Sequence, residues 1–161
     1  MAKAGKKGKE GVAPKSIQNR KARYDYAIQD TYEAGLILSG TEVKSLYQGK
    51  GNLTDAFCRV MKEELWILNL DIEPYDKASV FGHERRRDRK LLMHRKEIAT
   101  LERKQMEKGL SIIPLSVYFN DRGKAKVQIA LARGRSNYDK RDSIAKDDTR
   151  REIDRMRSEK L

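Results

Sequence analysis

Two histidines and one cysteine are the side chains of this 161-residue chain that are best suited to catalysis or metal binding. His94 and Glu97 are three residues apart in a segment that we predict to be helical, so they could act as base and acid on RNA. His83-Glu84 is followed by no second histidine at zinc-protease spacing. Cys58 is the single thiol, which excludes a disulfide within the chain and disfavours a structural metal site. We therefore expect neither a metal nor another cofactor.

A run of basic residues between positions 85 and 96 points to a different chemistry. The run consists of Arg85, Arg86, Arg87, Arg89, Lys90, Arg95 and Lys96. Glu84 and Asp88 are the acids close to it in sequence, so the run predicts a surface that binds a polyanion through guanidinium–phosphate pairs. Tyr24, Tyr26 and Tyr138 could stack on bases, whereas Trp66, Phe57 and Phe119 are expected in the core.

The positive charge is concentrated at the two ends of the chain. The net charge is +12 and the isoelectric point is near 9.8. Residues 1–23 carry +7 of this charge and residues 133–161 carry +3, which leaves +2 for residues 24–132. No stretch approaches the roughly 18 apolar residues of a membrane span, and no apolar leader follows the N-terminus. These features predict a cytoplasmic protein that binds nucleic acid and not a membrane.

Alternating apolar and polar residues predict a β-rich core. Strands are expected over residues 24–38, 57–61, 65–70, 113–119 and 127–131. Gly35 marks a bulge or bend in the first of them, and Pro114 places the fourth at a sheet edge or a bulge because proline cannot donate to a ladder. The last two strands form a hairpin, as do the second and third.

Helix signals are fewer than strand signals. A short helix is expected after Gly40 with Thr41 as its cap, and a longer helix is expected over residues 93–108 with Gly109 as its stop. Residues 73–88 lose apolar periodicity and are predicted to be a loop. The predicted fold class is therefore mainly β with helices: an OB-type small antiparallel β-barrel with two to three flanking helices.

The chain divides into three parts by composition. Residues 1–16 are expected to be a disordered basic arm, because they contain too few apolar side chains to offset the entropy of ordering. Residues 17–132 form the RNA-binding barrel. Residues 133–161 are a charged tail that we expect to be mostly disordered alone and helical when docked on a polyanion, since its acids and bases recur at helical spacing. A solvated tail without a role remains an alternative.

Several segments of the chain resemble one family. They are Asn19-Arg20-Lys21-Ala22-Arg23-Tyr24-Asp25-Tyr26, Tyr32-Glu33-Ala34-Gly35-Leu36, Gly40-Thr41-Glu42-Val43-Lys44-Ser45-Leu46, Gly51-Asn52-Leu53-Thr54-Asp55, Arg89-Lys90-Leu91-Leu92, Ile113-Pro114-Leu115-Ser116-Val117-Tyr118-Phe119 and Tyr138-Asp139-Lys140-Arg141. Together they resemble the SmpB family, the SsrA-binding proteins of bacterial trans-translation. The likeness runs in order from about residue 17 to residue 153.

This resemblance implies an OB-type barrel and a non-enzymatic adaptor. Its partner would be transfer-messenger RNA (tmRNA, or SsrA RNA), whose tRNA-like domain the barrel would complete. The tail would enter the decoding centre, formed by 16S rRNA, and the empty mRNA channel of a stalled 70S ribosome. Alanyl-tRNA synthetase and elongation factor Tu would be partners indirectly, through the charged RNA. No catalytic residue, cofactor or metal is implied.

The resemblance also implies roles for particular residues. The surface for the tRNA-like domain would comprise Asn19, Lys21, Arg23, Glu33, Glu42, Lys44, Lys90, Leu92 and His94. The two glutamates would either accept from base amino groups and 2′-hydroxyls or hold neighbouring arginines and lysines in place. The tail residues that contact the ribosome would be Gly134, Arg135, Tyr138, Asp139, Lys140 and Arg141. Tyr47 stands where the family commonly has arginine, which removes one expected phosphate contact.

Two other functions stay open at this point. A constitutive, ribosome-associated structural RNA-binding protein could combine a small barrel with charged tails in the same way. An RNA-cleaving enzyme that uses His94 and Glu97 would need those two side chains to be brought together at one site.

Overall fold

The computed structural model describes residues 14–77 and 82–159, and strands dominate the part before residue 135. The strands are β1 (Ile17–Gln18), β2 (Tyr26–Leu36), β3 (Gly51–Asn52), β4 (Phe57–Met61), β5 (Glu64–Leu68), β6 (Asp71–Ile72), β7 (Arg89–Leu92), β8 (Ser111–Phe119) and β9 (Ala125–Gly134). The helices are α1 (Arg20–Asp25), α2 (Gly40–Tyr47), α3 (Arg95–Lys108) and α4 (Asn137–Glu159).

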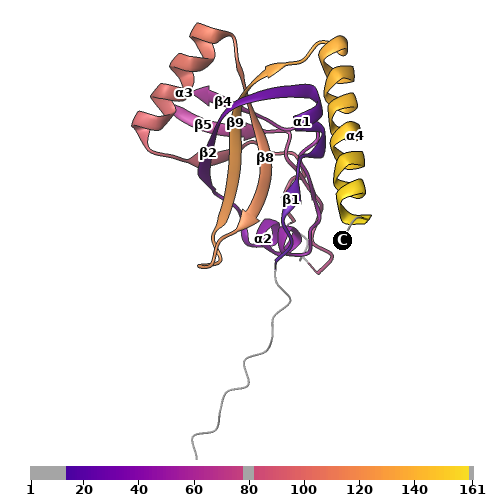
Figure 1. Ribbon diagram of the computed structural model, residues 1–161. Coiled ribbons are helices and arrows are strands. Elements are labelled where there is room, and N and C mark those ends of the chain that lie inside the picture. Colours follow the sequence, from indigo (N-terminus) through magenta and orange to yellow (C-terminus); the bar gives the residue numbers. More distant parts are fainter. Residues whose placement is uncertain (1–13, 78–81, 160–161) are drawn as a thin grey trace, which may run out of the picture.

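The main sheet closes into a barrel. Its strands follow the order β8-β4-β5-β7-β2-β9, and β9 pairs again with β8, so the ring is complete (Figure 1). Every pairing in the ring is antiparallel, and β1 is added outside it along β8. Strands β3 and β6 form a small separate ladder. The predicted fold class, a closed antiparallel barrel with flanking helices, is confirmed.

The barrel interior is an aliphatic core that the helices extend. Leu65 and Ile67 of β5 are wholly buried there, and so are Leu46 of α2 and Leu101 of α3. Gly109 adopts a left-handed conformation (φ 61°) directly after α3, as its predicted role as helix stop requires. Both predicted hairpins, β4–β5 and β8–β9, are present, so the alternation of apolar and polar residues correctly predicted these four strands.

Several local features differ from the sequence-based expectation. Helix α1 covers Tyr24 and Asp25, which were expected to begin the first strand, and Trp66 is only partly buried and not in the core. Strand β7 was not expected, because its Arg-Lys-Leu-Leu sequence shows no alternation. The residue before α2 is Ser39 and not Thr41, and its N–H donates to the Glu42 carboxylate at 2.9 Å. Phe57 is 41% exposed, not in the core. The bulge in β2 lies between Ile28 and Asp30 and not at Gly35.

The expected bulge at Pro114 is present. The register of β8 against β9 shifts between Pro114 and Ser116, so the proline occupies a position where the ladder is interrupted. Residues 73–77 and 82–88 have no strand or helix, as predicted, and residues 78–81 lie outside the described part of the chain.

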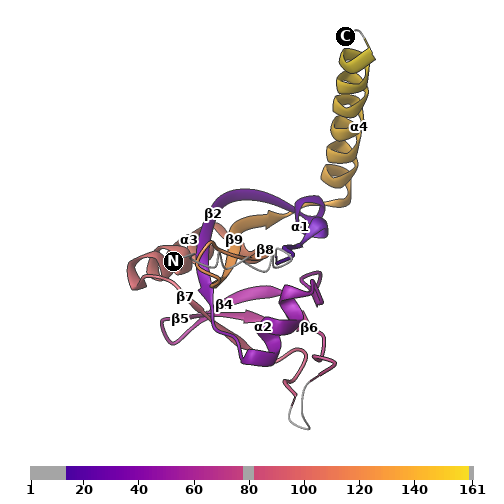
Figure 2. The ribbon, with the colours of Figure 1, turned by 90° about the horizontal axis from the view of Figure 1, so that it is seen from below.

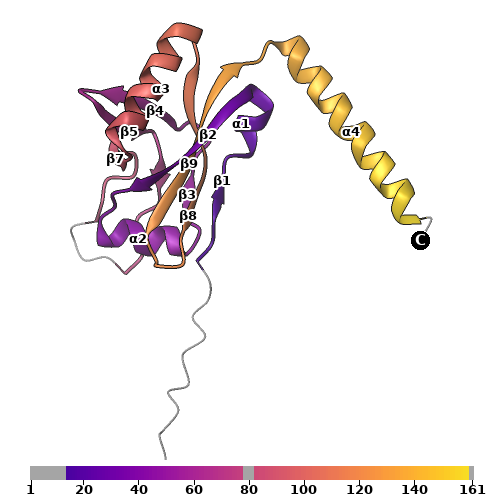
Figure 3. The ribbon, with the colours of Figure 1, turned by 60° about the vertical axis from the view of Figure 1, so that its left-hand side comes forward.

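Helix α4 leaves the barrel after β9. It follows the Arg135–Ser136 connection, contacts α1 and then projects away from the body (Figures 2 and 3). The side chains at 141 and 144–158 are exposed. The tail is a helix here without a partner, whereas it was expected to be mostly disordered alone. A helical tail on docking stays a prediction. The expected basic arm falls mostly on residues 1–13, outside the described residues, and stays a prediction. None of the described helices is both long and apolar enough to span a bilayer.

A substitution at Gly51 tests the close packing between β1, α2 and β3. A Cβ atom there would lie 2.5 Å from Ile17 Cδ1 and 2.9 Å from Leu46 Cδ2, whereas one at Gly40 would meet nothing within 4 Å. We expect Gly51→Ala to lower the free energy of unfolding by about 1–3 kcal/mol, because both neighbours are buried and must shift. Gly40→Ala should be neutral or stabilising. Urea unfolding measures both, and equal effects would contradict this packing.

Candidate nucleic-acid interface

A buried ion pair organises the region around the basic run. Arg89 of β7 and Glu42 of α2 are both wholly buried, and Arg89 Nε donates to the Glu42 carboxylate. Arg89 Nη1 also donates to the Leu70 carbonyl at 2.6 Å. The guanidinium makes further bonds to the carbonyls of Arg87, Glu84 and Arg85 at 3.1–3.3 Å. Arg89 therefore joins β7, α2 and the preceding loop and has no donor left for RNA.

Glu42 is the carboxylate on which these contacts converge. It accepts from the guanidinium of Arg87, including Nε at 3.1 Å, and from the Ser39 N–H as well as from Arg89. Burial alone would raise the pKa of Glu42, but these hydrogen bonds lower it from an ordinary 4.5 to about 2. The resemblance left two roles open for Glu42: accepting hydrogen bonds from RNA, or holding neighbouring cations in place. The geometry agrees with the second role, because Glu42 holds Arg87 and Arg89.

The basic run as a whole is more strongly paired than its local sequence suggests. Arg85 Nε donates to Asp71 at 3.0 Å, and Arg86 lies 3.8 Å from Asp71. Lys90 Nζ donates to Glu64 at 3.1 Å. Acids distant in sequence therefore neutralise much of residues 85–90, whereas Arg95 and Lys96 at the start of α3 are exposed. Phosphate binding by the run stays a prediction. Arg85 and Arg86 keep about half of their side-chain surface exposed.

The outer face of β2, β9 and β8 carries a different kind of surface. Glu33 is exposed on β2, lies opposite Gln128 of β9 and accepts a hydrogen bond from the Tyr118 hydroxyl of β8. Partial burial and Glu33 raise the pKa of Tyr118 to about 12, so the phenol stays a donor at neutral pH. Leu92 of β7 is paired with Gly35 next to this site and is 54% exposed. Sequence reasoning missed Tyr118, whose partner lies 85 residues away.

Helix α1 brings cations to the other end of the barrel. Arg20, Lys21 and Arg23 are exposed there, and the Arg135 N–H bonds to the Asp25 carbonyl at 2.8 Å, which brings the end of β9 beside α1. Arg133 is also exposed at that end of β9. These side chains suit phosphate binding better than the 85–96 run does.

Asn19 positions α1 and does not face solvent. Its Oδ1 accepts from the Ala22 N–H at 3.2 Å, as an N-cap does. Its Nδ2 donates to the carbonyls of Pro114 at 2.9 Å and Leu53 at 3.2 Å. With only 8% of its surface exposed, Asn19 holds α1 against β8 and the 53–56 turn.

The remaining candidates are dispersed over the surface. Lys44 of α2 is exposed, with its ammonium 5.4 Å from the Tyr75 ring centre. Tyr47 packs against Phe119 with ring centres 4.5 Å apart. His94 precedes α3 and is exposed, and no hydrogen bond joins its side chain to that of Glu97 among the described contacts. The enzyme alternative with His94 and Glu97 stays untested by this geometry.

The tail candidates lie along the end of β9 and the start of α4. Gly134 and Arg141 are exposed and Arg135 is half-buried. Tyr138, Asp139 and Lys140 lie in the first turn of α4, but their side chains fall outside the described part of the structure. Across the described residues, no group of histidine, cysteine and acidic side chains is placed to hold a metal ion.

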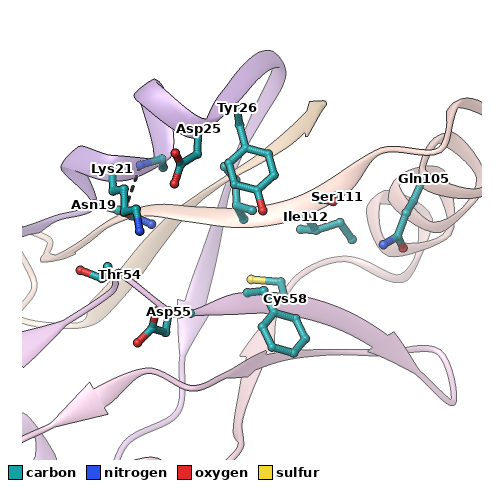
Figure 4. A pocket seen from close by; sticks show the side chains of 14 residues that line it. Asn19, Lys21, Asp25, Tyr26, Thr54, Asp55, Cys58, Gln105, Ser111 and Ile112 are labelled. Carbon is teal, nitrogen blue, oxygen red and sulfur yellow. Dashed lines mark hydrogen bonds between the residues drawn. The ribbon is translucent and has the colours of Figure 1, made fainter. Parts of the chain in front are cut away.

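A polar cavity of about 430 Å³ opens beside α1 (Figure 4). It lies between α1, the start of β4 and the start of β8. Lys21, Asp25 and Tyr26 line it from one side, and Asp55 lines it from the other. Burial strongly raises the pKa of the Cys58 thiol in its lining, so that sulfur stays protonated and unreactive. The cavity brings polar groups next to the cations of α1.

Comparison with known proteins gives one consistent result. The SmpB protein family model matches residues 16–159. An SsrA-binding protein from Desulforudis audaxviator is 58% identical over 138 residues, which cover 86% of this chain and 90% of that protein. The SsrA-binding protein from Thermobifida fusca is 52% identical over 93% of this chain and 94% of its own.

One solved structure gives the same result in three dimensions. It is described as "tmRNA-SmpB: a journey to the center of the bacterial ribosome" and superposes with a TM-score of 0.65 at 50% identity. The match covers 76% of this chain and 85% of that one.

Replacing Arg89 tests whether its buried pair stabilises the fold. Removing Arg89 leaves the buried Glu42 carboxylate with Arg87 as its remaining arginine partner and takes the donor away from the Leu70 carbonyl. Arg89→Ala should therefore lower the free energy of unfolding by about 3–5 kcal/mol. Arg85→Ala, a matched change of an arginine whose side chain is about half exposed, should cost less than about 1 kcal/mol. Chemical denaturation of both variants gives the comparison, and similar losses would show that the buried pair has no special weight.

Glu42 should make stability depend on acid pH. Its pKa is about 2 in the folded chain against an ordinary 4.5, so the stabilisation is complete above about pH 5 and disappears as the pH falls towards 2. The difference in unfolding free energy between the native chain and Glu42→Gln should therefore shrink over that range. Urea titrations at several pH values measure it, and a difference that stays constant would refute the assignment.

Proposed function

Because the chain belongs to the SmpB family, we propose that it is an RNA-binding adaptor of trans-translation, which binds the tRNA-like domain of tmRNA and delivers it to stalled ribosomes. The observation that carries this proposal is the extent of the match. It includes the barrel and the charged helix α4 together, at 50–58% identity over nearly the full length of several relatives. A likeness confined to the barrel would support RNA binding alone.

The barrel is proposed to recognise the folded RNA. Lys21 and Arg23 of α1 would bind phosphates, and exposed Glu33, with Tyr118 beside it, would accept from a base amino group or a 2′-hydroxyl. Exposed Leu92 would pack against a sugar or base next to them. Lys44, Lys90 and His94 would lie at the margin of this surface. Asn19 and Glu42 would act indirectly, since they are buried and hold α1 and the arginine loop.

The tail is proposed to bind a second RNA. Helix α4 projects from the barrel, and its charged side chains between residues 144 and 158 are exposed, which suits insertion into the mRNA channel (Figure 2). Gly134, Arg135, Tyr138, Asp139, Lys140 and Arg141 would contact the 16S rRNA of the decoding centre. The tail would then occupy the place of codon–anticodon pairing. Binding of tmRNA and acceptance on the ribosome would thus depend on separate parts of one chain.

The remaining elements of the proposal follow from this role. The protein would act in the cytoplasm and without catalysis, because its contribution is to position two RNAs. Elongation factor Tu and alanyl-tRNA synthetase would meet it indirectly, through the charged tmRNA.

Two double variants test the division between barrel and tail. Lys21→Ala/Arg23→Ala should weaken tmRNA binding and reduce the slope of its salt dependence by about 0.9 for each phosphate that the variant no longer neutralises. Lys140→Ala/Arg141→Ala should leave tmRNA affinity unchanged but block peptide tagging on stalled ribosomes. Filter binding and a reconstituted tagging assay measure the two properties, with circular dichroism as the folding control.

The test requires that each double variant lose one of the two properties and keep the other. If both variants lose tmRNA affinity to the same extent, the proposed division is wrong. If the tail variant tags normally, Lys140 and Arg141 do not act in acceptance.

A further inference from the structure

The cavity beside α1 originates in an incomplete seam of the barrel. In the described residues, β4 and β8 are joined at one residue pair, Cys58–Ile112, whereas β8 and β9 pair along most of their length. The two strands therefore separate on one side of this pair. Helix α1, held by the Asn19 amide, covers the opening without filling it. At about 430 Å³ the resulting cavity is in the size range of small-ligand sites.

The charges of the cavity favour a base over a phosphate. Asp25 and Asp55 line it, so a phosphate inside would meet like charge. Asp55 is mostly exposed, and its ion pair with Arg86 is a loose one at 3.9 Å. Lys21 also lines the cavity, and Arg20 and Arg23 are exposed on the same short helix. An RNA strand would thus keep its backbone on α1 while one base enters.

The lining also has the aromatic and polar groups that hold a base. Tyr26 points into the space between α1 and β4, and the side chain of Gln105 lies across the cavity from the two aspartates (Figure 4). Phe57 lines the cavity and is 41% exposed, which is unusual for a large apolar side chain at the start of a barrel strand. Aromatic rings stack on unpaired bases, and the amide of Gln105 can both donate and accept.

We propose that this cavity takes one unpaired guanine of an RNA partner, an inference that rests on the proposed function and adds base specificity to it. Guanine presents two adjacent donors, N1–H and N2–H, on its Watson–Crick edge, and the two oxygens of one carboxylate accept both. Asp55 is the carboxylate we assign to this contact, with Tyr26 and Phe57 as the stacking surfaces. Adenine, cytosine and uracil each lack this pair of adjacent donors.

Short RNAs test the specificity directly. Isothermal titration of the full chain with the pentamers 5′-UUGUU, 5′-UUAUU, 5′-UUCUU and 5′-UUUUU should show the guanine-containing strand binding roughly tenfold tighter or better. Amide NMR shifts on titration should concentrate at residues 54–57 and 111–113. Asp55→Asn should remove the preference for guanine, whereas Phe57→Ala should weaken the binding of all four strands, because stacking does not distinguish bases. Asp121→Asn, an exposed aspartate in the turn between β8 and β9, should keep the preference and serves as the matched control.

Each possible result of these titrations either supports or overturns the guanine site. Equal affinity for the four pentamers, no saturable binding, or a guanine preference that survives Asp55→Asn overturns the proposal. Thermal unfolding of each variant shows whether a loss reflects unfolding, and a folded Asp55→Asn variant without the preference supports it. Binding of the native chain to tmRNA is measured in parallel. Failure there would refute the proposed function, whereas failure with the pentamers alone would refute the guanine site.

Discussion

An arginine that is wholly inside a protein needs a counter-charge and a partner for each N–H, and the arrangement around Arg89 supplies both. Glu42 provides the charge, and carbonyl oxygens of the preceding loop and of Leu70 accept the remaining donors. Strand β7 and helix α2 are therefore fixed to each other through a group that the densest basic stretch of the chain contributes. The same interaction determines which cations remain for RNA.

The cations that remain lie mostly at the edges of the barrel. Because acids distant in sequence pair with Arg85, Arg87 and Lys90, much of the exposed positive charge lies on α1, the end of β9, α3 and α4. The barrel face around Glu33 and Leu92 is suited to hydrogen bonding and packing. Phosphate contacts give affinity without reading sequence, while contacts of the second kind distinguish one folded RNA from another. An adaptor that must select one RNA in the presence of bulk tRNA needs both.

The sequence predicted those parts of the fold whose signals are local. Alternation marked the strands of both hairpins, Gly109 marked the end of α3, and Pro114 marked a bulge. The sequence did not predict β7, because its apolar and polar residues do not alternate. Arg89 is buried there through an ion pair with a glutamate 47 residues away, which no local pattern reveals. The pairing of Tyr118 with Glu33 and the cavity at the β4–β8 seam likewise depend on tertiary contacts. Phe57 fits strand alternation, yet it lines that open seam and so stays exposed.

The central claim is that the barrel selects one structured RNA through its surface while the tail serves another. The most direct measurement is to recover the full chain from a lysate of cells that express it and to sequence the RNA that accompanies it, before and after ribosomes are dissociated. If the claim is right, tmRNA is strongly enriched over bulk tRNA, and the enrichment is retained once ribosomes are removed. Recovery of ribosomal RNA in fixed stoichiometry, with no tmRNA enrichment, would contradict the claim and indicate a constitutive ribosomal component.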